Sequence, residues 1–208
     1  MSVQKYRTMD NTAIVILAAG NSTRFGSTKQ LLRFNGKTLL QHAIEEATEA
    51  GADPVGVVLG ANANEVSASI DTTTVEIVLN NRWEEGMASG IVAGIRKVSS
   101  LTEHVHNIII AVCDQPFISS ALFKQLYQTQ TESQKGIVAC SYADTIGTPV
   151  LFTQQYFEHL LVLHGDEGAK KLLTTFATDV ATVHFPNGNF DIDTQIDYQE
   201  LIKDSRES

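Results

Sequence analysis

The sequence has few residues of the kinds that mark a disulfide-stabilised or membrane-spanning protein. Its 208 residues include 2 cysteines, and Cys113 and Cys140 form neither a C-x-x-C pair nor a disulfide framework. Both lie in apolar runs, which favours two reduced thiols in a core. No run approaches the roughly 18 apolar residues of a membrane span. Residues 1–11 lack the apolar region of a signal peptide, so we expect a cytoplasmic protein with no membrane partner.

Basic residues are scarce relative to acidic ones. The chain has 15 Lys and Arg against 24 Asp and Glu, and its formal net charge is −9. Broad binding of nucleic acid or of an anionic membrane needs a basic face, so this balance argues against both partners. A ligand that carries phosphate would have to be held by a local basic site, together with a metal cation.

Common motifs of nucleotide binding and covalent catalysis are absent as well. Gly20 and Gly26 stand one residue too far apart for G-x-x-x-x-G-K-[ST], and Lys29 does not directly follow the second glycine. Asn21 and Ser22 break the dinucleotide pattern G-x-G-x-x-G. No G-x-S-x-G elbow supports a serine nucleophile. The 6 histidines show no metal-binding spacing.

The chain does contain a regular alternation of strand-like and helix-like segments. Continuous apolar runs such as AIVIL are typical of strands buried on both faces, and TLLQHAIEEATEAG has apolar residues at helical spacing. This alternation predicts a single α/β domain with a mostly parallel, mixed sheet flanked by helices. We expect a loose arm over residues 1–11, the domain over 12–203 and a tail over 204–208.

Polar or small residues follow three of the predicted strands. A loop with Gly20, Arg24 and Lys29 follows the first, while Asn80 and Asp114 follow two later ones. In parallel sheets, ligands bind beyond the carboxyl ends of the strands, so we expect one shared site. Small residues, free N–H groups and two cations suit phosphate. Taken alone, the first loop is equally compatible with an ordinary turn whose basic side chains are solvated.

Carboxylates at two places are candidate metal ligands. Asp114 ends a buried strand, and Asp191 and Asp193 would share one face of an extended segment. Magnesium is often held by one or two carboxylates together with substrate phosphates. Each aspartate can equally be a turn or capping residue, so both interpretations stay open. If Asp114 and Asp193 converge on one Mg²⁺, removing either should relieve their repulsion in the metal-free protein.

Two further loops combine small residues with the start of a helix. In NNRWEEGMASG, Gly86 allows close backbone approach, and Ser89 lies near a helix N-terminus that favours anions or polar base edges. Trp83 and Met87 in the same segment suit core packing. In HGDEG, Asp166 precedes an amphipathic helix, which an ordinary capped helix start also explains.

Six segments occur in an order typical of one family: LAAGNSTRFGSTKQLL, NNRWEEGMASGIVAG, CDQP, GTPVLF, GDEGAKKLL and DIDTQIDY. From Ala13 to about Tyr198 the chain resembles the MobA-like nucleotidyltransferases, and especially the molybdenum cofactor cytidylyltransferases and their paralogues. The resemblance implies a GT-A-like, Rossmann-type fold. It also implies a Mg²⁺-dependent reaction that joins an NTP to a phosphorylated acceptor and releases pyrophosphate. LAAG with KQLL resembles the CTP-using branch, whose acceptor is the terminal phosphate of molybdopterin.

The resemblance also implies roles for individual residues. Arg24, Lys29 and Asp114 would be catalytic, the first two by holding the triphosphate, and Asp114 and Asp193 would hold Mg²⁺. The residues implied in nucleotide binding are Leu17, Ala18, Ala19, Gly20, Asn80, Gly86 and Ser89. The residues implied on the acceptor side are Thr148, Pro149, Asp166 and Gly168.

Two alternatives stand beside a molybdenum cofactor cytidylyltransferase. The same chemistry could serve a sugar or polyol phosphate, and a non-catalytic carrier could deliver the cofactor or a nucleotide to another protein. Catalysis is favoured because delivery does not need Arg24 and Lys29 to stabilise a leaving group. The expected partners are an NTP, with CTP preferred, the molybdopterin cofactor, and a molybdoenzyme or its chaperone. The chain itself is expected to be a monomer or a weak homodimer.

Overall fold

The central feature of the structure is a mixed seven-stranded sheet. The structure is a computed structural model that describes residues 9–21, 25–26 and 28–207. The strands of this sheet are β1 (Thr12–Ala18), β4 (Val55–Leu59), β5 (Glu76–Leu79), β6 (Asn107–Val112), β7 (Ile137–Tyr142), β8 (Thr145–Thr153) and β9 (Val180–His184). Their order is β5-β4-β1-β6-β8-β7-β9, and neighbours are parallel except where β8 pairs with β6 and β7. The predicted mostly parallel, mixed sheet is confirmed.

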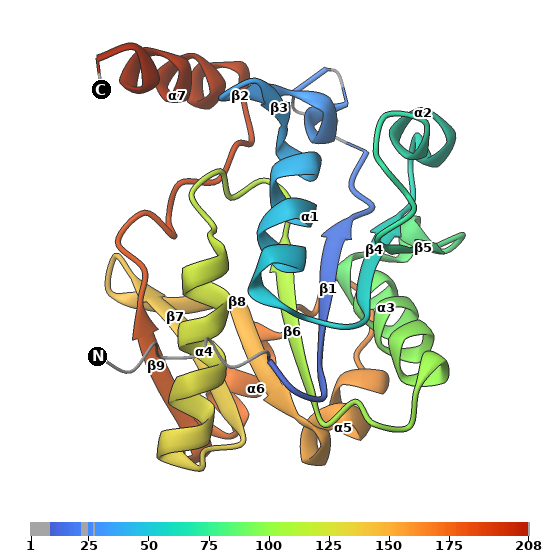
Figure 1. The fold of residues 1–208 in the computed structure, drawn as a ribbon, viewed down its shortest axis with the longest axis vertical. Coiled ribbons are helices and arrows are strands. Elements are labelled where there is room, and N and C mark those ends of the chain that lie inside the picture. The colour runs from blue at the N-terminus through green and yellow to red at the C-terminus, as the bar shows by residue number, and fades with distance from the viewer. Residues whose placement is uncertain (1–8, 22–24, 27, 208) are drawn as a thin grey trace, which may run out of the picture.

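Helices cover both faces of the sheet. They are α1 (Leu39–Ala50), α2 (Ala63–Ser67), α3 (Met87–Leu101), α4 (Ser120–Ser133), α5 (Phe157–Leu161), α6 (Lys170–Thr175) and α7 (Gln195–Glu207). α1 and α4 pack on the face that is in front in Figure 1, and α3, α5 and α6 pack on the other. On β1, Ile14 and Ile16 belong to one core and Val15 to the other, as strand alternation requires. Among the described residues, no helix is long and apolar enough to cross a bilayer.

Local caps set the limits of the two helices in front of the sheet. Thr38 Oγ1 accepts a hydrogen bond from the Gln41 N–H at 3.0 Å, and α1 ends at Gly51, whose φ is +86°. Ser119 Oγ accepts from the Leu122 N–H at 3.2 Å, where α4 begins. A hydroxyl before the first turn and a left-handed glycine after the last are the usual helix signals. The end of α1 and the start of α4 can therefore be predicted from the sequence.

The ends of the domain reach beyond their predicted limits. Met9 is 2% exposed, and the Asn11 carbonyl accepts from the N–H groups of His106 and Asn107 at 2.8 and 3.1 Å. Residues 9–11 of the expected arm thus pack with the domain, because the apolar side chain of Met9 is buried there. Residues 1–8 lie outside the described residues. At the other end, α7 continues to Glu207 and includes most of the expected tail.

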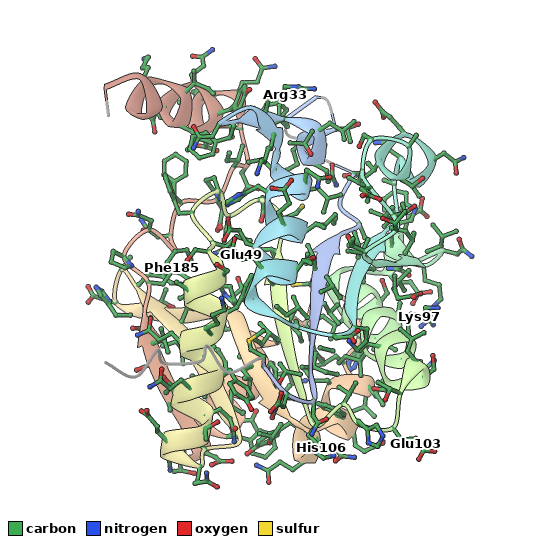
Figure 2. The ribbon with its side chains drawn as sticks, in the orientation of Figure 1. Arg33, Glu49, Lys97, Glu103, His106 and Phe185 are labelled. Atoms are coloured by element: carbon green, nitrogen blue, oxygen red, sulfur yellow. The ribbon has the colours of Figure 1, made fainter. Side chains whose placement is uncertain are left out.

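A third, smaller core joins α7 to the loop that follows β1. Its buried residues are Phe25, Leu39, Ile192 and Leu201. The ring of Phe25 meets that of Tyr198 edge to face, with centroids 6.2 Å apart. The Tyr198 hydroxyl donates to the carbonyl of Arg33 at 2.8 Å, and Arg33 lies beside α7 in Figure 2. Arg33 belongs to a two-stranded hairpin, β2 (Arg33–Phe34) and β3 (Lys37–Thr38). The C-terminal helix therefore braces this loop.

Candidate active site

A cleft of about 650 Å³ opens where β1, β5 and β6 end. It is lined by these residues singled out from the sequence: Leu17, Ala18, Ala19, Gly20, Lys29, Asn80, Gly86, Asp114, Thr148, Asp166 and Asp193. The three strand ends that we expected to share a site therefore meet at this cleft. Residues from the loops before α3 and α6 and from the segment before α7 complete its wall.

Four expected site residues are not among the described residues that line the cleft. Arg24 falls outside the described residues. Ser89, Pro149 and Gly168 lie outside the described lining of the cleft. Ser89 is 6% exposed; its hydroxyl accepts from Asn80 Nδ2 and donates to the Gly86 carbonyl, both at 2.8 Å. Ser89 therefore orients Asn80, a residue of the wall.

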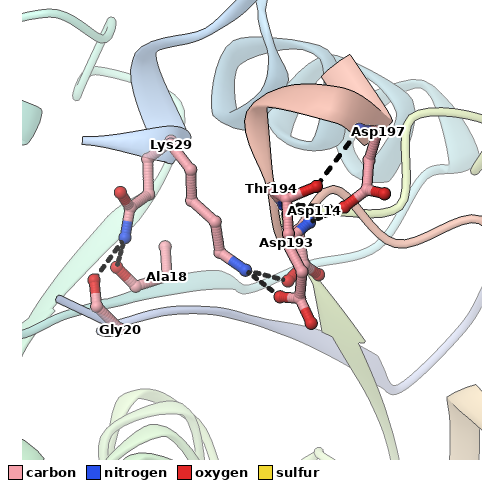
Figure 3. Close-up of polar contacts among 8 residues, drawn as sticks. Ala18, Gly20, Lys29, Asp114, Asp193, Thr194 and Asp197 are labelled. Carbon is pink, nitrogen blue, oxygen red and sulfur yellow. Dashed lines mark hydrogen bonds and ion pairs between the residues drawn. The ribbon is translucent and has the colours of Figure 1, made fainter. Parts of the chain in front are cut away.

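A buried glutamine fixes the loop that follows β1. Gln30 is 0% exposed, and its Nε2 donates to the carbonyls of Ala18 at 3.0 Å and Gly20 at 2.8 Å. One amide thus holds the backbone on both sides of Ala19, where the chain borders the cleft (Figure 3). Sequence reasoning used Gln30 only as part of the KQLL segment. The signal in the sequence was the position of this polar residue, which follows a glycine-rich loop and directly precedes the two leucines of KQLL.

The ammonium of Lys29 lies between two carboxylates. Its Nζ is 2.6 Å from Asp114 Oδ2 and 3.2 Å from Asp193 Oδ1. Dashed lines mark both contacts in Figure 3. The side chains of Lys29 and Asp114 are 15% and 19% exposed, and that of Asp193 is 43% exposed. Burial is the largest influence and opposes the charged form of Lys29, but the charge of Asp114 and the hydrogen bonds to Asp114 and Asp193 raise the pKa of Lys29 overall. Lys29 therefore stays positively charged.

Backbone contacts bring these carboxylates together although they are 79 positions apart in the sequence (193 − 114). The Ile192 N–H donates to the Asp114 carbonyl at 3.1 Å, which ties the segment before α7 to the end of β6. The Asp197 carboxylate accepts from the N–H groups of Asp193 and Thr194 at 3.0 and 2.6 Å. The Thr194 hydroxyl accepts from the Asp197 N–H at 3.3 Å. Thr194 and Asp197 thus cap α7, while the Asp193 carboxylate contacts Lys29.

The ion pairs correct one expectation. We expected the removal of Asp114 or Asp193 to relieve repulsion in the metal-free protein. The Lys29 ammonium contacts both carboxylates and already offsets that repulsion. Removing either aspartate would instead take away a partner of a largely buried charge, which destabilises a protein.

A third carboxylate adds negative charge to this corner of the cleft. Asp191 also lines it, and its carboxyl has a pKa raised to about 6. Removal from water is the main cause, and the charges of Asp114 and Asp193 add to it. Among the described residues, Asp114, Asp191 and Asp193 together carry more negative charge than the Lys29 ammonium can offset, which favours cation binding at this corner.

The donor set fits a magnesium ion that is shared with a ligand. Lys29 Nζ shows that oxygens of Asp114 and Asp193 reach one common point. Within residues 9–21, 25–26 and 28–207, no group of three or more His, Cys, Asp or Glu is placed to hold a metal by itself. Two carboxylates without further protein ligands match Mg²⁺, which commonly takes its remaining ligands from water and phosphate.

Two large apolar residues form another part of the wall. Trp83 and Met87 both line the cleft, and Met87 is 51% exposed. The core-packing interpretation of these two residues is therefore wrong. Apolar side chains of a ligand pocket resemble core residues in a sequence, because both interrupt polar stretches. The nearby Gly86 signalled a special backbone but not which side chains would face the cleft.

Gly86 is the junction between two loops of the cleft. Its φ is +99° and ψ is −176°, a conformation that essentially only glycine adopts. A Cβ at this position would lie 2.5 Å from Asp166 Oδ1 and 2.5 Å from the Gly165 carbonyl oxygen. The Ala88 N–H also donates to the Gly165 carbonyl at 3.1 Å. The loops before α3 and α6 are thus pressed together at Gly86.

Comparisons with known proteins agree with this architecture. A family model described as the MobA-like NTP transferase domain matches residues 14–181. Nicotine blue oxidoreductase of Paenarthrobacter nicotinovorans is 35% identical over 133 residues, which are 63% of this chain and 63% of that protein. The match thus spans less than two thirds of that relative. Purine catabolism protein PucB of Bacillus subtilis is 28% identical over 170 residues, covering 76% of this chain and 78% of PucB.

Solved structures resemble the chain over nearly its whole length. The crystal structure of Rv0371c from Mycobacterium tuberculosis H37Rv has a TM-score of 0.79 and 30% identity, and covers 92% of this chain and 97% of that one. A second structure of Rv0371c, in complex with manganese, has a TM-score of 0.77 and 28% identity. It covers 92% of this chain and 98% of that one.

Proposed function

Since the chain belongs to the MobA-like NTP transferase family, we propose that it is a nucleotidyltransferase that transfers CMP from CTP to the terminal phosphate of the molybdopterin cofactor. The observation that carries this proposal is the convergence of Lys29, Asp114 and Asp193 beside the glycine-rich loop. The resemblance of LAAG and KQLL to the CTP-using branch supports the choice of base. Trp83 and Met87 offer an apolar surface that suits a flat heterocycle.

The reaction needs positioning and charge stabilisation rather than a covalent intermediate. An oxygen of the acceptor phosphate attacks the α-phosphorus of CTP, and the bond to the bridging oxygen of the leaving pyrophosphate breaks. The acceptor phosphate is already an anion, so no general base is required. Lys29 and Arg24 would hold the leaving pyrophosphate. Asp114 and Asp193 would hold Mg²⁺, which supplies neutralising charge at the phosphates when it is bound.

The manganese complex of Rv0371c supports a divalent cation in this proposal. The second candidate is the same transfer to a sugar or polyol phosphate. Polar residues of the cleft wall, such as Thr148 and Asp166, could form hydrogen bonds with the hydroxyls of such an acceptor. A carrier that delivers a nucleotide is less well supported, because a cation between two carboxylates serves phosphoryl chemistry more than delivery.

One panel of assays tests the proposal. Each of the four NTPs is combined with molybdopterin or with a sugar phosphate, and pyrophosphate release is measured with Mg²⁺ or Mn²⁺. Release with molybdopterin alone supports the proposed acceptor. Release only with the sugar phosphate supports the second candidate. No release with any pair, while nucleotide still binds, supports the carrier.

CTP is expected to be used in preference to GTP. Ala18 and Ala19 line the cleft where Gln30 fixes the backbone, and a purine needs room or hydrogen-bond partners that a pyrimidine pocket lacks. Competition between CTP and GTP in one reaction, with the two products quantified, measures the preference. A preference for GTP would refute the cytidylyltransferase branch but would leave nucleotidyl transfer in place.

A further inference from the structure

We propose that Lys29 holds the metal site closed until a nucleoside triphosphate draws its ammonium away. Metal alone then binds weakly, and metal and nucleotide enter together. This inference rests on the proposed function in one respect, because it takes Asp114 and Asp193 as the metal ligands. It adds a second role to Lys29, which occupies the place of the metal before it contacts the triphosphate.

The Lys29 ammonium occupies the position that a metal ion between the two carboxylates would take. Lys29 Nζ lies 2.6 Å from Asp114 Oδ2 and 3.2 Å from Asp193 Oδ1, so it sits where a cation held by those two oxygens would sit. Mg²⁺ takes oxygen ligands at about 2.0–2.1 Å. Two cations cannot share that space, because they would overlap and repel each other. Metal binding to these carboxylates therefore requires the ammonium to leave.

The Lys29 ammonium competes strongly with a metal ion for the two carboxylates. The side chains of Lys29 and Asp114 are 15% and 19% exposed, so water screens their attraction little. A charge removed from water must keep a partner, since an unpaired buried charge is strongly destabilising. Lys29 leaves the carboxylates only when another anion is within reach.

The anion that can draw Lys29 away is the triphosphate of a nucleotide bound beside the loop. Lys29 begins a short 3-10 helix, and the next residue, Gln30, anchors the backbone to Ala18 and Gly20. The backbone of Lys29 is thereby held, while its four-carbon stem can rotate. Ala18, Gly20 and Lys29 line the same cleft, so a triphosphate beside the loop comes within reach of the ammonium. Because coupling between two ligands is reciprocal, metal and nucleotide then strengthen each other's binding.

The test measures Mn²⁺ binding to the whole chain without nucleotide, by electron paramagnetic resonance of the free ion. Lys29→Met keeps the length of the side chain and removes its charge. We expect this variant to bind Mn²⁺ alone about tenfold more tightly than the unchanged protein, within the usual range of coupling energies. In the unchanged protein, CTP should tighten Mn²⁺ binding strongly, and it should do so less in Lys29→Met.

Lys97→Met is the matched control. Lys97 Nζ pairs with Glu76 Oε2 at 3.1 Å on the surface, and Lys97 lies on α3 at the edge of the molecule in Figure 2. Its loss removes the same charge without opening the carboxylate pair, so Mn²⁺ binding should not change. Lys29→Gln, which is neutral and shorter, repeats the test if Lys29→Met fails to fold by thermal melting.

Two results would overturn the inference, and they differ from each other. If Lys29→Met and Lys29→Gln bind Mn²⁺ alone as weakly as the unchanged protein, Lys29 does not close the site. If Asp114→Asn leaves Mn²⁺ binding in the presence of CTP unchanged, the carboxylates are not the metal ligands, and the proposed metal site is lost as well. Tighter Mn²⁺ binding in the Lys29 variants, together with loss in Asp114→Asn, supports both proposals.

Discussion

Asp114→Asn is expected to lower kcat by at least about 100-fold, the scale on which a single preorganised charge-stabilising group acts. The amide keeps the volume of the side chain but loses its charge, so it weakens the proposed metal site and removes one of the two carboxylates that pair with Lys29. The backbone contact from the Ile192 N–H to the Asp114 carbonyl is unaffected, so the protein should still fold, but at a lower melting temperature because Lys29 loses one carboxylate partner. Turnover measured together with a thermal melt separates loss of function from loss of structure.

Two comparisons sharpen this expectation. Asp193→Asn should have the smaller effect, because Asp193 is more exposed and lies farther from Lys29 than Asp114 does. Glu76→Gln makes the same carboxylate-to-amide change in an exposed ion pair with Lys97 and should leave kcat unchanged. Wild-type turnover in Asp114→Asn would make Asp114 a structural partner of Lys29 only.

Gly86→Ala is expected to lower the free energy of unfolding by about 2–4 kcal/mol, from backbone strain and overpacking together. The φ of +99° disfavours any side chain, and the new Cβ would lie 2.5 Å from the Gly165 carbonyl oxygen. That carbonyl is backbone and is held by the Ala88 N–H, so it cannot swing aside. The melting temperature should fall by about 2–4 °C for each kcal/mol lost.

Gly20→Ala is the matched control for stability. Among the described residues, no atom beyond the two chain neighbours of Gly20 lies within 4 Å of a Cβ added there, and the φ of Gly20 lies outside the left-handed region. The melting temperature of this variant should therefore change by no more than about 2 °C, as for an ordinary surface substitution. Equal melting temperatures for Gly86→Ala and the unchanged protein would show that the loops before α3 and α6 can move apart without loss.

The sequence was sufficient to predict the architecture because the relevant signals are local. Apolar runs and helical spacing predict alternating strands and helices, and residues such as Gly51 and Ser119 predict helix limits. The antiparallel insertion of β8 between β6 and β7 was not predictable, because strand order depends on contacts between distant segments. Residue type could place Asp114 at a strand end, as the structure does.

The contacts of the site were less accessible to sequence reasoning. Lys29 and Asp193 are 164 residues apart, and no local pattern states that their side chains meet. Gln30 is polar yet fully buried, so its role appears only when its two carbonyl partners are known. Met87 is apolar yet half exposed, because it forms part of a cleft wall rather than a core.

The late position of Asp193 in the chain has a consequence for biosynthesis. Lys29 and Asp114 are synthesised before Asp193, which follows β9, the last described strand of the sheet. The residues that pin it, Ile192 and Asp197, are made at the same late stage. All the strands of the sheet are therefore synthesised before Asp193 is available to pair with Lys29. Under the proposed function, the site would be complete only once α7 has been synthesised, after all the strands of the sheet.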